Sequence, residues 1–258
     1  MNSQNSILLI DPAFDLHTAQ NCTLLLRLGM DNFSYAILDN ETHKISVVFD
    51  EQECEDVVAK LSEQLKSDPN LGLPFTEIKI AIYTENNISI PNSLYVHDDE
   101  KLNANFFNQP HSGSLYTNPH PNFDFTSVFS FSKITDEIIS KSLTNSKKYQ
   151  PNAALLKLAE TMSDTSLLLD FTAGSISVLY VKDKKVVFEQ GFEIENAEEF
   201  NYYLLLMINQ LQFNLNVTQV YLTGIIHESD DKHTCLTNYF KEIQFLNYVN
   251  PNLDQQIL

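Results

Sequence analysis

The chain contains an internal repeat, in which one hydrophobic pattern occurs twice about 143 positions apart. The matched segments are residues 23–27 with 166–170, 33–38 with 176–181, and 47–50 with 186–189. In both copies, a leucine-rich strand leads through a short turn into a second strand and then a third. Each copy therefore predicts one supersecondary unit, and the repeat limits the fold more than any single motif does.

Composition excludes several classes of partner. With 258 residues, of which 43% are hydrophobic and 19% charged, the chain has room for two modest folded domains. The net charge of −18 repels phosphate backbones and anionic lipids, so we expect no nucleic acid partner. The apolar run at 7–10 is too short for membrane insertion. Three scattered cysteines favour reduced thiols in a cytoplasmic protein.

The first copy predicts three strands, a helix and a fourth strand. The strands are expected near 22–29, 33–39, 43–49 and 78–82. Asp50 is the expected N-cap of the helix, since Glu53 follows three residues later. One apolar stripe then comprises Val57, Val58, Leu61 and Leu65. The order is that of a meander followed by a crossover helix.

The second copy repeats this order with a clearer helix. Asn196 and Glu199 have the spacing of a capping box. A periodic apolar face follows and comprises Phe200, Tyr203, Leu204, Met207, Ile208 and Leu211. A fourth strand is expected at 218–222, a helix near 229–240 and a last strand at 243–249.

The segment between the copies differs in character. Residues 98–124 are rich in Asn, Pro and Gly, which predicts an irregular loop or insertion. Its aromatic residues are Phe106, Phe107 and Tyr116. A strand near 123–131, a helix near 133–144 and a helix from Pro151 lead into the second copy. We therefore expect two domains, residues 1–150 and 151–258, with the boundary at 145–151.

The element order predicts an α/β protein with mixed sheets. A crossover helix between the third and fourth strands adds a parallel strand to an antiparallel meander, which is the ribonuclease H-like unit. Two such units in tandem resemble the actin-like ATPase superfamily, which includes actin, Hsp70 and sugar kinases. The chain is also similar to an uncharacterised bacterial family with this fold.

The resemblance implies a nucleotide site between the two domains. In the superfamily, two hairpin loops hold the phosphates, an Asp ends the first strand of each half, and a small-residue turn in the second half lies near the adenosine. The implied candidate residues are Arg27, Gly29, Ser34, Asp170, Gly174, Ser175, Thr223 and Gly224.

Several of these positions depart from the family pattern. Thr172 and Ile225 stand where the second half usually has glycines, and Arg27 replaces the Asp of the first half. A cation cannot hold hydrated Mg²⁺ as a carboxylate does. We expect Arg27 to pair with Asp170 instead.

Glycine content independently indicates a degenerate nucleotide site. Phosphate-binding loops need several neighbouring backbone N–H groups with no Cβ between them. The chain has only six glycines, and no two are closer than 17 residues. No Walker, dinucleotide or kinase-type glycine loop is present.

Other candidate sites are weaker. Ribonuclease H-like nucleases gather several carboxylates around two metals, whereas Asp170 is the only carboxylate expected at such a position. Residues 227–233 carry metal-ligating residue types, which also occur at ordinary helix starts. We expect no metal and no cofactor.

The sequence therefore predicts a non-catalytic protein with a degenerate nucleotide site, acting through protein contacts. Residues 98–124 are the candidate contact surface, and the alternative is a surface insertion that packs its own aromatic residues. The alternative is a nucleotide-binding or ATP-hydrolysing protein with divergent phosphate loops, which would need ATP and Mg²⁺.

Overall fold

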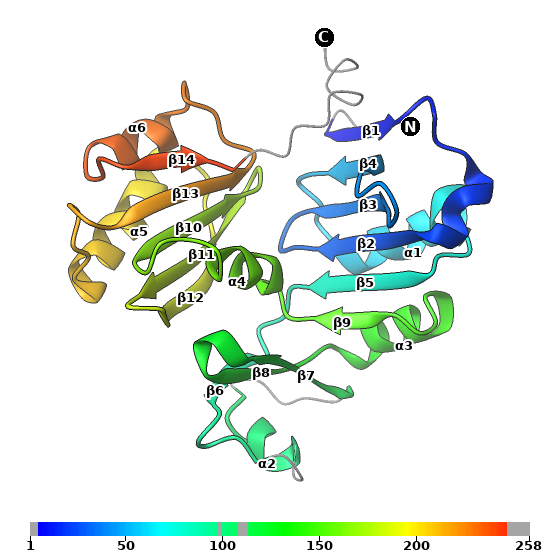
Figure 1. Cartoon of the computed structure of the whole chain (residues 1–258), viewed down its shortest axis with the longest axis horizontal. Helices are drawn as coiled ribbons and strands as arrows, with labels where there is room; N and C mark the ends of the chain where they lie inside the picture. The colour runs from blue at the N-terminus through cyan, green and yellow to red at the C-terminus, as the bar shows by residue number, and fades with distance from the viewer. Residues whose placement is uncertain (1–4, 97–99, 108–112, 247–258) are drawn as a thin grey trace. The chain divides into compact units, whose positions relative to one another are not determined.

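Two β-sheets with the same order of core strands form the frame of the structure (Figure 1). The computed structural model describes residues 5–96, 100–107 and 113–246. These residues form two compact units, which we call unit 1, ending at Pro151, and unit 2, beginning at Asn152.

The main sheet of unit 1 has six strands in the order β1-β4-β3-β2-β5-β9. Their bounds are β1 Ser6–Ile10, β2 Cys22–Leu28, β3 Phe33–Asp39, β4 Ile45–Glu51, β5 Glu77–Ile82 and β9 Lys147–Tyr149. Strands β2, β3 and β4 form the predicted antiparallel meander, and β5 pairs with β2 in parallel. Short 3-10 helices, η1 Leu16–Asn21 and η2 Pro69–Gly72, flank this sheet. The lead-in strand β1 was not expected from the sequence.

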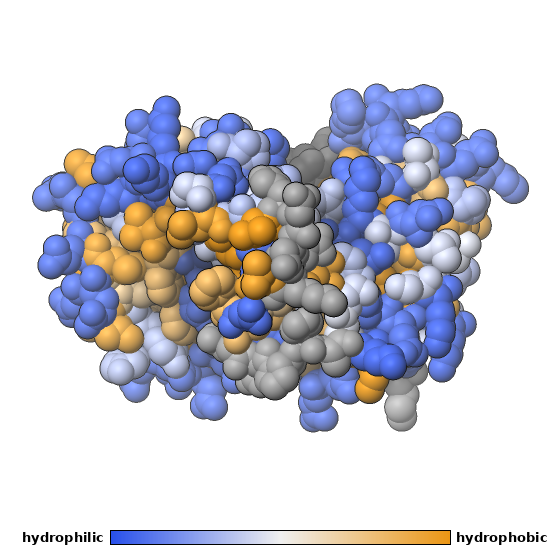
Figure 2. Space-filling model, turned by 90° about the horizontal axis from the view of Figure 1, so that it is seen from below, coloured by the Kyte–Doolittle hydropathy of each residue, from blue (hydrophilic) through white to orange (hydrophobic). Residues whose placement is uncertain are grey.

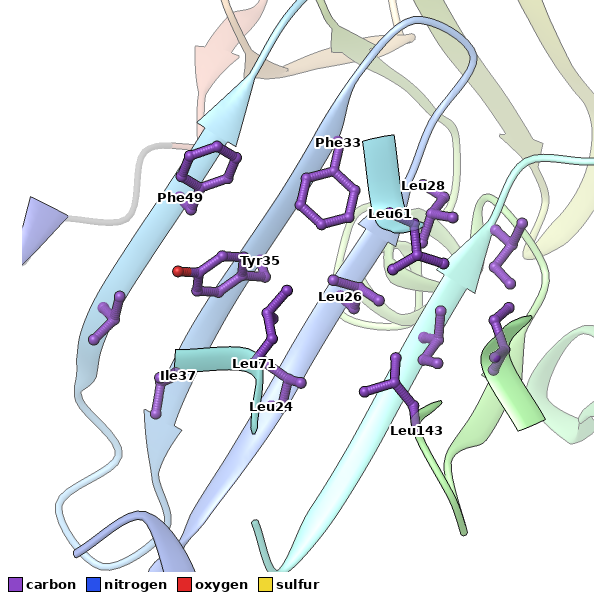
Figure 3. Close-up of a cluster of buried hydrophobic side chains, with 14 of the residues drawn as sticks. Leu24, Leu26, Leu28, Phe33, Tyr35, Ile37, Phe49, Leu61, Leu71 and Leu143 are labelled. Atoms are coloured by element: carbon purple, nitrogen blue, oxygen red, sulfur yellow. The ribbon is translucent and has the colours of Figure 1, made fainter. Parts of the chain in front are cut away.

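Alternation along β2 explains which face of this sheet is covered. Leu24, Leu26 and Leu28 are almost fully buried, and they point to the same face as the aromatic side chains of β3 (Figure 3). Leu61 from α1 (Val57–Ser67) and Ile139 from α3 (Lys133–Ser142) belong to the same cluster. Both helices therefore cover one face, as strand alternation requires.

The predicted start of α1 was wrong. Asp50 lies within β4, where it pairs with Ser34 of β3 and Ile7 of β1. The helix begins at Val57, and its N-cap Asp56 accepts hydrogen bonds from the N–H groups of the next turn. Because Asp50 pairs with a strand on each side, β4 continues through the position where the capping pattern predicted the start of the helix.

The predicted irregular character of residues 98–124 was also wrong. A helix α2 (Glu100–Ala104), a strand β7 (Leu115–His120) and a 3-10 turn η3 (Pro121–Phe123) lie there. Strand β7 forms an antiparallel sheet with β8 (Phe125–Ser130) and β6 (Asn87–Pro91), in the order β6-β8-β7. Pro119 is tolerated because β7 is an edge strand, where a missing N–H breaks no central ladder. Residues 97–99 and 108–112 lie outside the described residues.

Tyr116 is part of this sheet rather than of a loop. Its ring lies 5.8 Å from Phe129 and 5.3 Å from Phe131, centroid to centroid. Its hydroxyl donates to Asp136 of α3. Tyr116 therefore joins the small sheet to helix α3 within unit 1.

Unit 2 repeats the arrangement of the core strands. Its sheet has the order β12-β11-β10-β13-β14. The bounds are α4 Ala153–Ala159, β10 Ser166–Phe171, β11 Ser175–Lys182, β12 Lys185–Glu193, α5 Ala197–Leu211, β13 Gln219–Gly224, α6 Asp231–Thr237 and β14 Ile243–Phe245. Strand β13 pairs with β10 in parallel, as β5 does with β2. The predicted last strand at 243–249 is shorter, and residues 247–249 lie outside the described residues.

Helices lie on both faces of the unit 2 sheet. The predicted apolar face of α5 packs on β10 and β11, together with Leu236 of α6. Helix α4 lies against β10 and β11 on the opposite face (Figure 1). The predicted cap is confirmed, since Asn196 Oδ1 accepts from the Glu199 N–H at 2.9 Å.

On the face seen in Figure 2, hydrophilic residues alternate with groups of hydrophobic residues. Among the described residues, no helix is both long enough and apolar enough to cross a membrane.

Candidate functional site

The candidate residues of unit 2 gather where β10 and β13 end. The two strands are parallel and in register, with Asp170 opposite Thr223 and Phe171 opposite Gly224. Asp170 is only 8% exposed, and its Oδ1 accepts a hydrogen bond of 2.7 Å from the Thr223 hydroxyl. This carboxylate is therefore held in place by the neighbouring strand.

The turn after β10 is closed by its own side chains. The backbone N–H of Thr172 donates to the carbonyl of Ser175 at 3.0 Å. The two hydroxyls lie 2.7 Å apart, and the Ser175 N–H donates to the Thr172 hydroxyl at 2.9 Å. Both residues are buried. The hydroxyls of this turn thus serve first to hold its shape.

Gly224 is required by the backbone around it. Its φ of +80° is one that other residues rarely adopt, and a Cβ would lie 2.0 Å from the carbonyl oxygen of Phe171. The following N–H, of Ile225, donates to that same carbonyl at 2.8 Å. The packing of β13 against β10 therefore explains this glycine without a ligand.

In unit 1, the position equivalent to Asp170 carries a cation that faces its own carboxylate. Arg27 pairs with Ser34 of β3, and Ser34 pairs with Asp50 of β4, so the three side chains share one face of the sheet. Burial raises the pKa of Asp50. A hydrogen bond from Gln52, the charge of Arg27 and a hydrogen bond from Asn32 act in the opposite direction.

The turn after β2 has the same backbone closure as its counterpart in unit 2. The Gly29 N–H donates to the Asn32 carbonyl at 2.8 Å, as Thr172 does to Ser175. A Cβ on Gly29 would meet Asn32 Oδ1 at 1.8 Å. Asn32 therefore fills the space that Thr172 fills in the other copy.

The structure brings the predicted residues into two equivalent groups. Asp170, Gly174, Ser175, Thr223 and Gly224 lie at the ends of β10 and β13 or in the turn after β10, all in unit 2. Arg27, Gly29 and Ser34 occupy the corresponding end of β2 and β3 in unit 1.

Asn32 and Asp50 were missed as site residues. Asn32 lies in the turn that the repeat predicts, so its position could have been found from the spacing. Asp50 comes from a different strand, and only the pairing of β4 with β3 places it beside Arg27.

The group in unit 1 offers a guanidinium, a hydroxyl and one carboxylate. A cation in this position repels Mg²⁺, which prefers carboxylate and water oxygens. The group in unit 2 offers a carboxylate that could accept hydrogen bonds from a ligand or from metal-bound water. Within the part of the chain that the structure describes, no three His, Cys, Asp or Glu side chains are placed to hold a metal ion.

The histidine-rich segment at 227–233 is occupied by local contacts. His233 Nδ1 lies 3.0 Å from the Glu228 carbonyl oxygen, and its ring packs against Phe245. Asp230 accepts from the His227 N–H at 2.8 Å. These contacts are those of a loop leading into a helix.

Comparison with protein families gives a match over residues 11–243 to the family described as "Protein of unknown function (DUF3822)". No curated protein matches the chain.

Solved structures with the same fold have low sequence identity to this chain. A protein from Bacteroides thetaiotaomicron, described as having an actin-like ATPase fold and unknown function, is 18% identical with a TM-score of 0.77. The match covers 95% of this chain and 98% of that one. A structure described as the PilM-PilN type IV pilus biogenesis complex is 12% identical, with 87% and 88% covered and a TM-score of 0.54. The ethanolamine utilization protein EutJ from Carboxydothermus hydrogenoformans is 9% identical, with 92% and 87% covered and a TM-score of 0.50. The predicted actin-like ATPase fold is confirmed.

Proposed function

Because the chain belongs to the DUF3822 family and has an actin-like ATPase fold, we propose that it is a non-catalytic protein with a degenerate nucleotide site. It acts through contacts with other proteins. Its place of action is the cytoplasm, a proposal supported by three cysteines that form no disulfide.

The observation that carries the proposal is the charge at the end of β2. Arg27 takes the place of a metal-binding carboxylate and shares a row with Ser34 and Asp50. Asp50 faces Arg27, whose positive charge balances that of the Asp50 carboxylate. To bind a metal ion in place of the missing carboxylate, Asp50 would have to lose this interaction with Arg27. The salt bridge between Arg27 and Asp170 stays a prediction.

Two further observations support a degenerate nucleotide site. The hydroxyls of Thr172 and Ser175 bind each other within the turn. Ile225 follows Gly224 with its side chain 45% exposed, which adds bulk where the family has a second glycine. A phosphate would have to displace the bond between the two hydroxyls, and Ile225 lies in the turn that the resemblance places near the adenosine.

The alternative, a nucleotide-binding or ATP-hydrolysing protein, has one observation in its favour. Asp170 and Thr223 are held together at the ends of two parallel strands, the place where α/β sheets commonly bind ligands. ATP and Mg²⁺ would be the cofactors of this alternative.

A thermal-shift measurement with millimolar Mg-ATP distinguishes the two. A ligand that binds only the native state, at about 100 times its Kd, stabilises it by about 2.7 kcal/mol. We expect no rise in melting temperature. A rise that is lost in Asp170→Ala and kept in Glu228→Ala, an exposed carboxylate of the same unit, would establish the alternative.

Of the three aromatic residues in the predicted contact surface at residues 98–124, only part remains available to a partner. Tyr116 is bonded to Asp136 of α3, and Phe107 is half-buried, whereas Phe106 is 71% exposed. The PilM-PilN complex shows that a protein with this general fold assembles with a partner. We therefore propose that Phe106 is the residue of this segment that contacts a partner protein.

A capture experiment tests Phe106 directly. We expect Phe106→Ala to lose a partner that Ile134→Ala retains, because Ile134 is 70% exposed and provides a matched loss of apolar surface. Identical partners in both variants would remove this segment from the proposal.

A further inference from the structure

Helix α5 carries apolar side chains on two opposite faces. One face is buried against the sheet of unit 2 (Figure 1) and comprises Phe200, Leu204 and Met207. The other face is open to solvent and comprises Tyr202, which is 63% exposed, Leu206, which is 41% exposed, and Leu205, which is 36% exposed. Because successive residues advance by about 100° around a helix, these three side chains lie in one arc on the side away from the sheet. A helix that is apolar all round is typically covered on both sides.

The equivalent helix of the repeat has no such outer face. Helix α1 connects the third and fourth strands of its copy, as α5 does in unit 2. Its exposed residues are small or charged and comprise Ala59, Glu63, Lys66 and Ser67. Lys60 of the same helix forms ion pairs with Glu51 and Glu63. The fold therefore does not require an apolar outer face on this helix, and its presence on α5 indicates a contact surface.

The three exposed side chains form one contiguous surface. Leu205 and Leu206 follow Tyr202 by three and four residues, so they are its neighbours on the helix. The ring of Tyr202 lies 5.5 Å from that of Tyr203, with an interplanar angle of 66°. Tyr203 in turn lies 4.6 Å from Phe192 of β12, between ring centroids. Tyr202 is therefore supported by side chains that are packed against the sheet.

The stretch of chain that forms this surface carries no charge. The net charge of the chain is −18, yet residues 200–226 contain no Asp, Glu, Lys or Arg. Two identical acidic molecules repel one another, so a second copy approaches most favourably at a neutral apolar face. A basic partner would gain no electrostatic attraction here and would bind better at an acidic surface. The charge distribution therefore fits a second copy of the chain.

The surface is also self-complementary about a two-fold axis. In a symmetric dimer the same surface meets itself, and two helices that cross a perpendicular two-fold axis run antiparallel. With the axis between Leu205 and Leu206, each Leu205 faces Leu206 of the second copy. Each Tyr202 then faces Asn209, an exposed residue whose side-chain carbonyl can accept from the tyrosine hydroxyl. Glu198 lies one turn outside this pairing, so it does not face its own copy across the axis.

We propose that two copies of the chain associate through the outer face of α5, in an antiparallel helix pair with Leu205 and Leu206 at the two-fold axis. A single helix face gives an interface at the small end of the usual range. The dimer is therefore reversible, and its population rises with protein concentration. The inference does not depend on the nucleotide site, and it adds a second copy of the chain to the contacts of the proposed function.

Sedimentation velocity of the full chain over a concentration series measures the dimer. Leu206→Glu should weaken it by about 100-fold, because a like charge then appears on both sides of the axis. Leu206→Gln removes the apolar contact without adding charge and should weaken it by about tenfold. Ile134→Glu is the control and should leave the dimer unchanged, since Ile134 is a 70% exposed side chain of α3 in unit 1. Circular dichroism checks that each variant is folded.

Disulfide cross-linking tests the antiparallel geometry. Tyr202→Cys and Asn209→Cys, mixed and then oxidised, should give a covalent dimer because the two positions face each other. Either variant alone should give much less, since the two copies of residue 202 lie about 10 Å apart along the helix axis, beyond the reach of a disulfide. The wild type measures the background from its own cysteines. Equal cross-linking in the mixture and in the single variants would contradict the antiparallel pairing.

Ionic strength separates a second copy from a basic partner. Salt screens the repulsion between two molecules that each carry a charge of −18. The dimer should therefore become stronger as salt rises from about 0.05 M to about 0.5 M. A dimer that weakens over this range would contradict the charge argument.

Other outcomes overturn the inference. A chain that stays monomeric at every concentration would do so, as would equal weakening of the dimer by Leu206→Glu and Ile134→Glu. A different protein that the monomeric chain captures, and that Leu206→Glu loses, would also assign this surface to another occupant. A monomer with no response to Mg-ATP removes the dimer and leaves the proposed function standing. A response to Mg-ATP removes the proposed function and leaves the dimer to be judged by sedimentation.

Discussion

At the scale of single residues, the two copies of the repeat fill the same turn in different ways. Unit 1 uses Gly29 with the larger Asn32, whereas unit 2 uses Thr172 with the smaller Ser175. The backbone closure is the same in both. In each copy, a smaller side chain at one position of the turn is matched by a larger one at the other. The shape of the turn is therefore preserved while its chemistry changes.

Substitution of three glycines by alanine tests this packing. Gly72→Ala should be neutral or stabilise by about 0.4–1 kcal/mol, because nothing lies within 4 Å of the new Cβ. Gly29→Ala should destabilise by about 1–3 kcal/mol through overpacking against Asn32. Gly224→Ala should cost most, since it meets backbone and has a positive φ. Urea unfolding of the three variants measures the order, and an equal effect at Gly29 and Gly72 would contradict the account.

The bond between Asp170 and Thr223 gives a second prediction. Thr223→Val removes the donor but keeps the shape, so a nearly buried carboxylate loses a partner, and stability should fall by about 1–2 kcal/mol. Thr223→Ser retains the hydroxyl and should lose less. Thermal unfolding of the pair measures the difference. Equal losses would show that the hydroxyl contributes little.

At the scale of elements, hydrophobic periodicity predicted the strands and helices that bury one face. The stripes on α1 and α5 and the leucines of β2 were found this way, whereas β10 was predicted from consecutive leucines and is buried on both faces. The strand β7 was not predicted, because it lies in a segment rich in Asn and Pro and pairs with β8 at the edge of its sheet. The candidate site was predicted where the repeat aligns, at Arg27 and Asp170, whereas Asp50 depended on a pairing that spacing does not encode.

The corrected start of α1 gives a prediction. Asp56→Ala removes a side chain that accepts from two backbone N–H groups, at 3.0 and 2.9 Å. Loss of such a cap costs about 0.5–2 kcal/mol. Asp15→Ala, which removes the one N–H bond of a 3-10 turn, is the control and should cost less. Helical content and urea midpoints measure both.

The contact between the small sheet and α3 gives a prediction in alkali. Burial and the hydrogen bond to Asp136 raise the pKa of Tyr116 from 10.0 to about 12. The folded state then holds its proton above the pH at which the unfolded state releases it. The stabilisation is therefore complete below pH 10 and is lost as pH rises toward 12.

Tyr116→Phe should remove this pH dependence and lower stability by about 1 kcal/mol, since the pair is partly exposed. Melting temperature followed as a function of pH measures it, and ultraviolet absorbance reports the ionisation. A wild-type curve parallel to that of Tyr116→Phe between pH 10 and 12 would contradict the assignment.

At the scale of the whole molecule, two units share one strand order and one register while their turn chemistry has diverged. The fold follows from buried leucines and aromatics, which both copies keep. Nucleotide binding depends on a few polar groups at the strand ends, where the copies differ. The scaffold and the chemistry of this fold are therefore separable.

The most direct test of this separation is a calorimetric titration of Mg-ATP into the full chain, with Arg27→Asp titrated alongside. We predict no binding heat for the wild type, because Arg27 occupies the position of the metal-binding carboxylate and faces Asp50. Saturable binding by the wild type, lost in Asp170→Ala, would show that the nucleotide site is functional and would contradict the account.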